Sequence, residues 1–596
     1  MPIQLQLGDG ISVGSAESGY DSEERSRELK YGIKYKWIAL SNTTLGGLMA
    51  AINGSILIIS LPAVFKGLGI NPLVPGNIGL LLWILLGYMI VSSVTVVTIG
   101  RLSDMFGRVR LYNLGFLIFT VFSILLYASS YLVTGVYGAL SIIILRLFQG
   151  FGGAFLFANG AAILTDAFPP NERGRAMGFN QIAAVGGSLA GLLIGGVLAT
   201  IDWHLIFLIS VPFGVIGTVW AYVALHEIAT IKKGQRLDIY GNVAFAASLT
   251  IILLSITYAL FPYGAHPMGW YNPAVILGMA AGAALMAGFI LIESRVAEPM
   301  FNLGLFRIRQ FSAGNASLLL AGVARGGLQF MLIIWLQGIY LPLHGVSFEN
   351  TPLQAAIYMV PLIVGFLVSG PLSGYLSDRY GARLFSTTGM LVGAAGFVAL
   401  SFLPANFNPM YFGILIFILG IGQGMFAAPN TTAIMNSLPP EKRGAGSGMR
   451  ATFTNISFMF SLAIFFTLLV TGTTQTMPSA LYNGLVSQNV SSSVALSISK
   501  LPTTSALFAA LLGYNPLATI LPSNVLAALP AQNSNTILGT SFFPNLISKP
   551  FMSGLRVVFL TGAALSVIAA IASALRGPRY VWSHTAAPAS RGKDPK

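Results

Sequence analysis

Fourteen apolar runs, each long enough to cross a lipid bilayer, recur along the 596-residue chain. A membrane-spanning helix needs about 20 apolar residues, because the hydrocarbon core has no water to satisfy the backbone and a helix bonds its own N–H and C=O groups. Only 8% of the residues are charged, which excludes an ordinary soluble domain. We therefore predict an all-α membrane protein with spans at 38–62, 77–99, 111–130, 135–162, 176–200, 205–226, 240–262, 273–293, 310–340, 352–376, 382–404, 410–436, 445–472 and 555–575.

The basic residues predict how these spans are oriented, since Lys and Arg are retained on the cytoplasmic side of a membrane. If the amino terminus lies inside, 25 of the 32 Lys and Arg residues fall in inner segments, and the outer segments hold only Lys66, Lys500 and Lys549. This asymmetry predicts a multi-pass protein of the cell (plasma) membrane with both termini in the cytoplasm. Topology therefore accounts for the net charge of +14 without nucleic acid.

Three segments of the first half of the chain recur, in the same order, in the second half. These pairs are the Gly-x-Leu-Ser-Asp motifs that begin at Gly100 and Gly374, the Gln-Gly pairs at 149–150 and 423–424, and the Pro-Pro loops at 169–174 and 439–444. The repeat predicts two parallel six-helix bundles with an inserted helix pair, and a substrate path between the bundles.

These features divide the chain into segments with different roles. We expect a cytoplasmic tail at 1–36, an N-terminal six-helix bundle at 37–226, a two-helix linker at 227–309, a C-terminal six-helix bundle at 310–575 and a cytoplasmic tail at 576–596. Residues 473–553 form an insertion without acidic residues, which we place outside the cell. Its apolar pieces are too short to span, so it is expected to form short amphipathic or re-entrant helices over the outer mouth, with a disordered loop as the alternative.

The repeated motifs resemble those of the major facilitator superfamily, in its fourteen-span drug:proton antiporter family. The similarity covers 37–470 and resumes at 555–580. It implies a secondary transporter that exports a small lipophilic or amphipathic compound by alternating access, as multidrug efflux carriers do. Two positions depart from the family pattern: Asn53 stands where a first-span carboxylate is usual, and Leu192 replaces the proline of the fifth-span motif. Proton coupling therefore stays open.

The first copy of the repeated loop motif predicts an inner gate. An acid docked on the amino terminus of a neighbouring helix is stabilised by the helix dipole and is released when the halves rock apart. The alternative is a solvated turn between two spans. The candidate gate residues are Gly100, Asp104, Gly107, Arg108 and Arg110, with Asp378 and Arg383 in a shorter second copy.

Polar side chains within the spans are candidates for substrate binding or coupling. A guanidinium in a span is costly and normally faces a bundle interior or a watery cavity, although Arg146 is also consistent with a structural hydrogen-bonding post. None of the 18 acidic residues falls near the middle of a span, so the path is expected to be positive and to favour neutral or anionic compounds. The candidates are Asn53, Arg146, Gln149, Arg325, Gln329, Asn430, Arg450 and Asn455.

Other classes of function lack their signatures in this sequence. The chain has no cysteine, and its glycine-rich stretches lack the lysine of an ATP-binding loop. We expect no enzymatic activity, no metal and no cofactor. The expected partners are a small-molecule substrate and the lipid bilayer, with protons as a candidate coupling ion, no nucleic acid and a monomeric state. A non-transporting membrane sensor on the same scaffold is the alternative function, although the short inner tails leave little room for a signalling domain.

Overall fold

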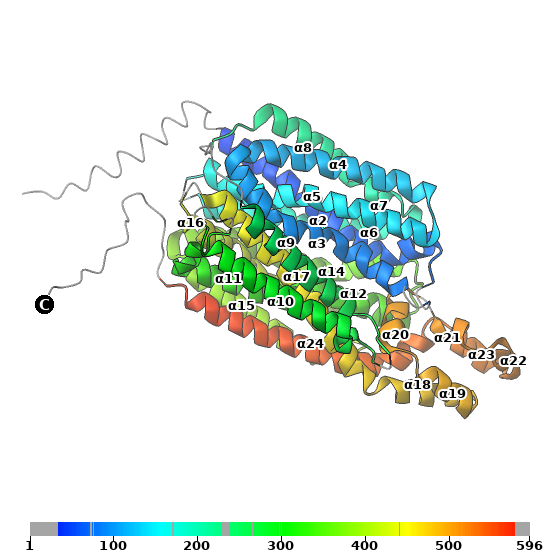
Figure 1. The fold of residues 1–596 in the computed structure, drawn as a ribbon. Helices are drawn as coiled ribbons and strands as arrows, with labels where there is room; N and C mark the ends of the chain where they lie inside the picture. Colours follow the sequence, from blue (N-terminus) through cyan, green and yellow to red (C-terminus); the bar gives the residue numbers. More distant parts are fainter. Residues whose placement is uncertain are drawn as a thin grey trace, which may run out of the picture.

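The computed structural model describes residues 34–71, 74, 77–169, 172–228, 238–264, 266–296, 299, 301–439, 442–513 and 515–577. The predicted terminal tails lie largely outside these ranges, as do residues 229–237 near the start of the predicted linker. Fourteen helices in the described ranges are long and apolar enough to cross a membrane, and they run side by side in Figure 1. No β-strand occurs in the same ranges. The predicted all-α membrane fold with fourteen spans is confirmed.

The first six spans form the N-terminal half. They are α2 (Tyr35–Leu68), α3 (Asn77–Phe106), α4 (Arg108–Leu132), α5 (Gly135–Ala167), α6 (Arg173–Ile201) and the pair α7 (Leu205–Leu208) and α8 (Ser210–Ala224), which together make one span.

The last six spans form the C-terminal half. The first of them is built from α11 (Arg309–Gly326), α12 (Leu328–Trp335), a π-helical turn η3 (Leu336–Tyr340) and α13 (Leu341–Leu343). The others are α14 (Thr351–Tyr380), α15 (Ala382–Leu400), α16 (Pro409–Asn436), α17 (Arg443–Thr474) and α24 (Phe542–Ala574).

The inserted spans α9 (Ile239–Ala259) and α10 (Pro273–Glu293) pack against each other and lie beside the junction of the two halves. Thr98 of α3 donates a hydrogen bond to Asn242 of α9, and Trp270 of the short helix η1 (Gly269–Tyr271) donates to Thr467 of α17. A second short helix, η2 (Leu303–Arg307), leads into α11.

Close packing of α2 on α6 depends on glycines spaced four residues apart. A Cβ atom at Gly187 would lie 2.7 Å from the carbonyl oxygen of Leu48, and one at Gly191 would lie 2.2 Å from Ser55 Oγ. Small residues on one helix face let backbones approach in a membrane, where lipid supplies no hydrophobic drive for helix association. These glycines of α6 therefore have a packing role.

Two helix boundaries differ from the predicted ones. The last span begins at Phe542, 13 residues before the predicted 555. The first turns of this helix are polar, so hydropathy does not assign them to a membrane span. The gate motif is not a loop: α3 continues to Phe106 and α4 begins at Arg108, so that Gly107 alone connects them, with φ at 106°. A side chain is strained at that φ, which explains the glycine.

The insertion is helical and lies at one end of the bundle (Figure 1). It contains α18 (Met477–Val486), α19 (Ser492–Ser499), α20 (Thr503–Leu511), α21 (Pro516–Ile520), α22 (Ser523–Ala528) and α23 (Ala531–Leu538). Helices α19 and α20 are bent by 85° relative to each other. Helix α20 is buried: a Cβ atom at Gly338 of η3 would lie 3.3 Å from Ala510, and the Phe508 ring lies 5.1 Å from that of Phe466 in α17. We call this end of the bundle the cap end and the opposite end, where α3 meets α4, the motif end.

Candidate functional site

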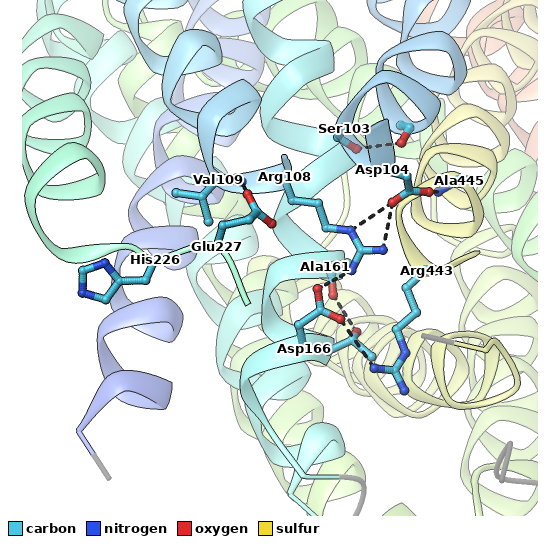
Figure 2. A network of polar contacts seen from close by, with 12 residues as sticks. Ser103, Asp104, Arg108, Val109, Ala161, Asp166, His226, Glu227, Arg443 and Ala445 are labelled. Atoms are coloured by element: carbon cyan, nitrogen blue, oxygen red, sulfur yellow. Dashed lines mark hydrogen bonds and ion pairs between the residues drawn. The ribbon is translucent and has the colours of Figure 1, made fainter. Parts of the chain in front are cut away.

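A buried cluster of charged residues joins α3, α4 and α5 at the motif end (Figure 2). Arg108 donates from Nε and Nη2 to Asp104 Oδ1, at 3.0 and 2.8 Å, and from Nη1 to Asp166. Asp104 and Arg108 are four residues apart and both are buried. Charges removed from water are tolerated only when they are paired and hydrogen-bonded, and this guanidinium satisfies both carboxylates.

The same cluster reaches across to the C-terminal half. Asp104 Oδ2 accepts a hydrogen bond of 2.9 Å from the backbone N–H of Ala445, the third residue of α17. The first N–H groups of a helix have no partner within it, and the helix dipole favours an anion there. Arg443, the first residue of α17, also lies 3.5 Å from Asp166. Asp104 and Asp166 therefore hold α17 against the N-terminal half.

A second contact closes the motif end between α6 and α16. Arg173 donates to the carbonyl oxygens of Thr165 and Phe168, at 3.1 and 3.0 Å, and to Asn436 Oδ1 at 3.0 Å. Asn436 is the last residue of α16, in the opposite half. The two halves are thus in contact through polar groups at this end.

Glu227, which follows α8, contacts the cluster from a third side (Figure 2). Its Oε2 accepts a hydrogen bond of 2.9 Å from the backbone N–H of Val109, in the first turn of α4. Burial raises the pKa of the Glu227 carboxyl above that of an ordinary glutamate, although hydrogen bonds from Val109 and Arg108 and the charge of Arg108 oppose the rise. Glu227 was not among the predicted gate residues, because nothing in the local sequence shows where the chain returns after the sixth span.

The other predicted gate residues are placed differently. Gly100 allows a close approach, since a Cβ atom at Gly448 of α17 would lie 3.5 Å from its Cα. Arg110 and Arg383 are exposed. Asp378 is half-buried near the end of α14, and Ala382 follows Gly381 where Arg108 follows Gly107. The second motif therefore has no arginine at the position that bridges the carboxylates in the first.

The predicted polar residues of the N-terminal half lie together in its core. Asn53 of α2 donates to Gln149 Oε1 of α5 at 3.3 Å, and Gln149 donates to Ser123 Oγ of α4 at 2.9 Å. Arg146 is 2% exposed, lies 5.4 Å from the centre of the Tyr88 ring, and has no hydrogen-bond partner at Nε or Nη1. A cation near an aromatic face gains part of the stabilisation that a carboxylate would otherwise give.

In the C-terminal half, Asn430 of α16 joins three helices. Its Nδ2 donates to the carbonyl oxygen of Gly314 in α11 at 3.2 Å, and its Oδ1 accepts a hydrogen bond from Arg576, just after α24. Arg576 is 1% exposed, and burial lowers its pKa to about 10. Arg576 was predicted to begin a cytoplasmic tail, and its contact with Asn430 was not predicted, because its position just beyond a helix gave no sign of burial.

The remaining predicted polar residues do not lie together in the structure. Asn455 of α17 donates to Ser92 of α3 at 3.3 Å, which adds a contact between the halves. Arg450 is half-buried with Nε unpartnered, and Gln329 is half-buried with Nε2 unpartnered. Arg325, in α11, is exposed.

Within the described ranges, no group of three or more His, Cys, Asp or Glu residues has the geometry to hold a metal ion. The contacts described at the motif end are ion pairs and hydrogen bonds between helices.

Comparison with known proteins places this architecture in a family. The family model for the Major Facilitator Superfamily matches residues 43–462. The riboflavin transporter RibZ of Clostridioides difficile is 32% identical over 438 residues, which cover 73% of this chain and 88% of that protein. The tetracenomycin C resistance and export protein of Streptomyces glaucescens is 26% identical, covering 72% of this chain and 75% of that protein.

Other similar proteins agree with this assignment. The multidrug transporter protein MdtP of Bacillus subtilis is 24% identical, covering 88% of this chain and 89% of that protein. Among solved structures, the proton:xylose symporter XylE is similar in fold, with a TM-score of 0.50 and 14% sequence identity over 83% of this chain and 97% of that one. The chain therefore belongs to the major facilitator superfamily.

Proposed function

We propose that this protein is a secondary active transporter that exports a small lipophilic or amphipathic compound by alternating access. Several relatives bear names of drug or antibiotic exporters, whereas RibZ is named as a riboflavin transporter. The proposal places the motif end in the cytoplasm of a plasma-membrane protein, because 25 of the 32 Lys and Arg residues belong to segments on that side. We propose further that it acts as a monomer.

The observation that carries the proposal is the contact between Asp104 and the amino terminus of α17. It joins residues 341 positions apart, in opposite halves, through one carboxylate oxygen and one backbone N–H. A hydrogen bond of this kind orders the closed arrangement and leaves both helices intact when it breaks. Asp104, Arg108, Asp166 and Arg443 thus form the inner gate of the proposed transport cycle.

The charge of the path supports a neutral or anionic substrate. Arg146 is buried, and its Nε and Nη1 have no hydrogen-bond partner. Gln149, one turn further along α5, contacts Asn53 and not a carboxylate. A positive interior repels cations and attracts anions, most strongly where the local dielectric constant is low. Protons are the candidate coupling ion of this proposal, exchanged at residues other than position 53.

The gate is tested with the substitution Asp104→Asn in proteoliposomes. The assay measures uptake and release of a compound panel that includes riboflavin and ethidium, with and without an imposed pH gradient. The parent protein is expected to carry at least one compound faster than protein-free vesicles. Asp104→Asn is expected to reduce that flux at least about tenfold, because breaking a buried ion pair costs about 3–5 kcal/mol and 1.4 kcal/mol is a tenfold change.

The control is Glu172→Gln, which removes a carboxylate at the same end of the bundle. Glu172 pairs with Lys36 at 2.7 Å, and its side chain is 40% exposed. Surface ion pairs contribute little, so this variant should transport like the parent. Normal flux in Asp104→Asn, with the protein correctly inserted, would reduce the Asp104 contact to a structural one. Absence of flux for every compound would favour the sensor alternative.

A further inference from the structure

Glu227 occupies a position in the gate that the repeated motifs do not include. It lies three residues after the end of α8, the last helix of the N-terminal half. Its carboxylate nevertheless reaches the single-residue connection between α3 and α4. A Cβ atom at Gly107 would lie 2.8 Å from Glu227 Oε2, so the carboxylate is packed directly on that connection.

The carboxylate of Glu227 acts as the cap of α4. Gly107, at the N-cap position of this helix, has no side chain to accept hydrogen bonds from the first turn. The first N–H groups of a helix need acceptors from elsewhere, and an anion is the most favourable one because of the helix dipole. Glu227 Oε2 accepts from Val109 N–H at 2.9 Å and thereby supplies what Gly107 lacks.

The segment that carries Glu227 is itself held in place. The Tyr35 hydroxyl at the start of α2 donates to the carbonyl oxygen of His226 at 2.6 Å and accepts from the His226 N–H at 3.1 Å. The Tyr35 and His226 rings are also stacked, with centres 5.9 Å apart. Glu227 therefore presents its carboxylate from a backbone that α2 fixes on one side and α8 on the other.

The residue next to Val109 is Arg108, the central cation of the gate. Its guanidinium reaches Asp104 and Asp166 at once, a geometry that depends on where the first turn of α4 places its Cα. We propose that Glu227 is a positioning residue of the motif-end gate, which caps α4 and so holds Arg108 in the orientation that bridges the two carboxylates. This inference rests on the proposed gate function of the Asp104 cluster.

The test uses a reporter cysteine inside the closed motif end. Thr452 is 2% exposed and lies seven residues after Ala445, which places it on the same face of α17, toward α3. Because the chain contains no cysteine, a thiol introduced by Thr452→Cys is the only one in the full-length protein. The rate at which a maleimide labels it, in reconstituted vesicles, measures how often the motif end opens.

Glu227→Met and Glu227→Gln separate the hydrogen-bond acceptor from the volume of the side chain. Methionine fills similar space without an oxygen, so we expect labelling at position 452 to become about fivefold faster, as the loss of a helix cap predicts. Glutamine retains an uncharged acceptor and should restore the rate partly, to between those of Glu227→Met and the parent. Glu172→Gln, outside the gate, should label like the parent.

Comparison with Asp104→Asn separates a failure of the proposed gate from a failure of the positioning role of Glu227. If Asp104→Asn accelerates labelling while Glu227→Met labels at the parental rate, the gate stands and the positioning role of Glu227 is wrong. If Glu227→Gln labels as fast as Glu227→Met, the acceptor has no role and the inference is likewise overturned. If Asp104→Asn leaves the rate unchanged, the gate proposal itself fails. Size-exclusion elution as a single peak verifies that each variant is folded.

Discussion

The proposed preference for neutral or anionic substrates is tested most directly by a substitution at Asn53. Introducing Asn53→Asp places a carboxylate against Gln149, one turn from Arg146 and its unpartnered nitrogens. A negative charge there lowers the positive potential of the path and adds a group that can exchange a proton for a cation. We expect faster transport of monovalent ethidium and a new dependence on pH, measured as flux in vesicles between about pH 5 and 8.

The matched control for that substitution is Asn42→Asp. Asn42 is also a buried residue of α2, but its amide contacts the carbonyl oxygen of Gly217 in α8 and not Gln149. This variant should not acquire ethidium transport. If the parent protein already exports ethidium against a proton gradient, the account of a positive path is wrong.

At the residue scale, the sequence indicated which polar side chains lie in or beside the membrane spans. It did not indicate which residues they contact. Asp104 and Arg108 were recognised because they belong to a charged motif that recurs in both halves of the chain. The acceptor role of Glu227 and the contact of Arg576 with Asn430 join positions 118 and 146 residues apart, respectively. Such pairs depend on how helices are packed, and no local pattern encodes that.

At the element scale, the packing of α2 on α6 is expected to depend on Gly191. A methyl group there would lie 2.7 Å from the carbonyl oxygen of Ile52, which cannot move without displacing α2. Gly191→Ala should therefore destabilise the protein by about 1–3 kcal/mol, the usual cost of overpacking. The measurement is the thermal unfolding midpoint of the purified protein in detergent.

Gly160 supplies the control for this prediction. It lies inside α5, and a Cβ atom built on it meets nothing within 4 Å. Gly160→Ala should leave the midpoint unchanged or raise it, since alanine favours a helix by about 1 kcal/mol over glycine. A midpoint that falls equally in both variants would show that the loss does not arise from the α2–α6 contact.

The lengths and number of the spans were predictable because the membrane imposes them. The burial of the cap-end insertion, in contrast, could not be predicted from hydropathy. Thr503–Leu511 is too short to span, and its burial arises from contact with the π-helical turn η3 and with α17. Those surfaces come from distant parts of the chain, so the sequence indicated a re-entrant or amphipathic helix without specifying its neighbours.

At the scale of the whole molecule, the two halves are joined at both ends by a few polar contacts. Asp104 and Arg173 link them at the motif end, and Lys66 pairs with Glu349 at 2.9 Å at the cap end. The latter pair is exposed and contributes little by itself. Transport by alternating access requires that the cap end open and close in each cycle.

The most direct test of this account locks the cap end and measures flux. In the double variant Lys66→Cys and Glu349→Cys, a short bifunctional thiol reagent with a reducible spacer can join the two halves, since no other cysteine competes. The account predicts that cross-linking abolishes flux of a transported compound in proteoliposomes, that reduction of the spacer restores it, and that either single variant is unaffected by the reagent. Undiminished flux through fully cross-linked protein would contradict transport by alternating access.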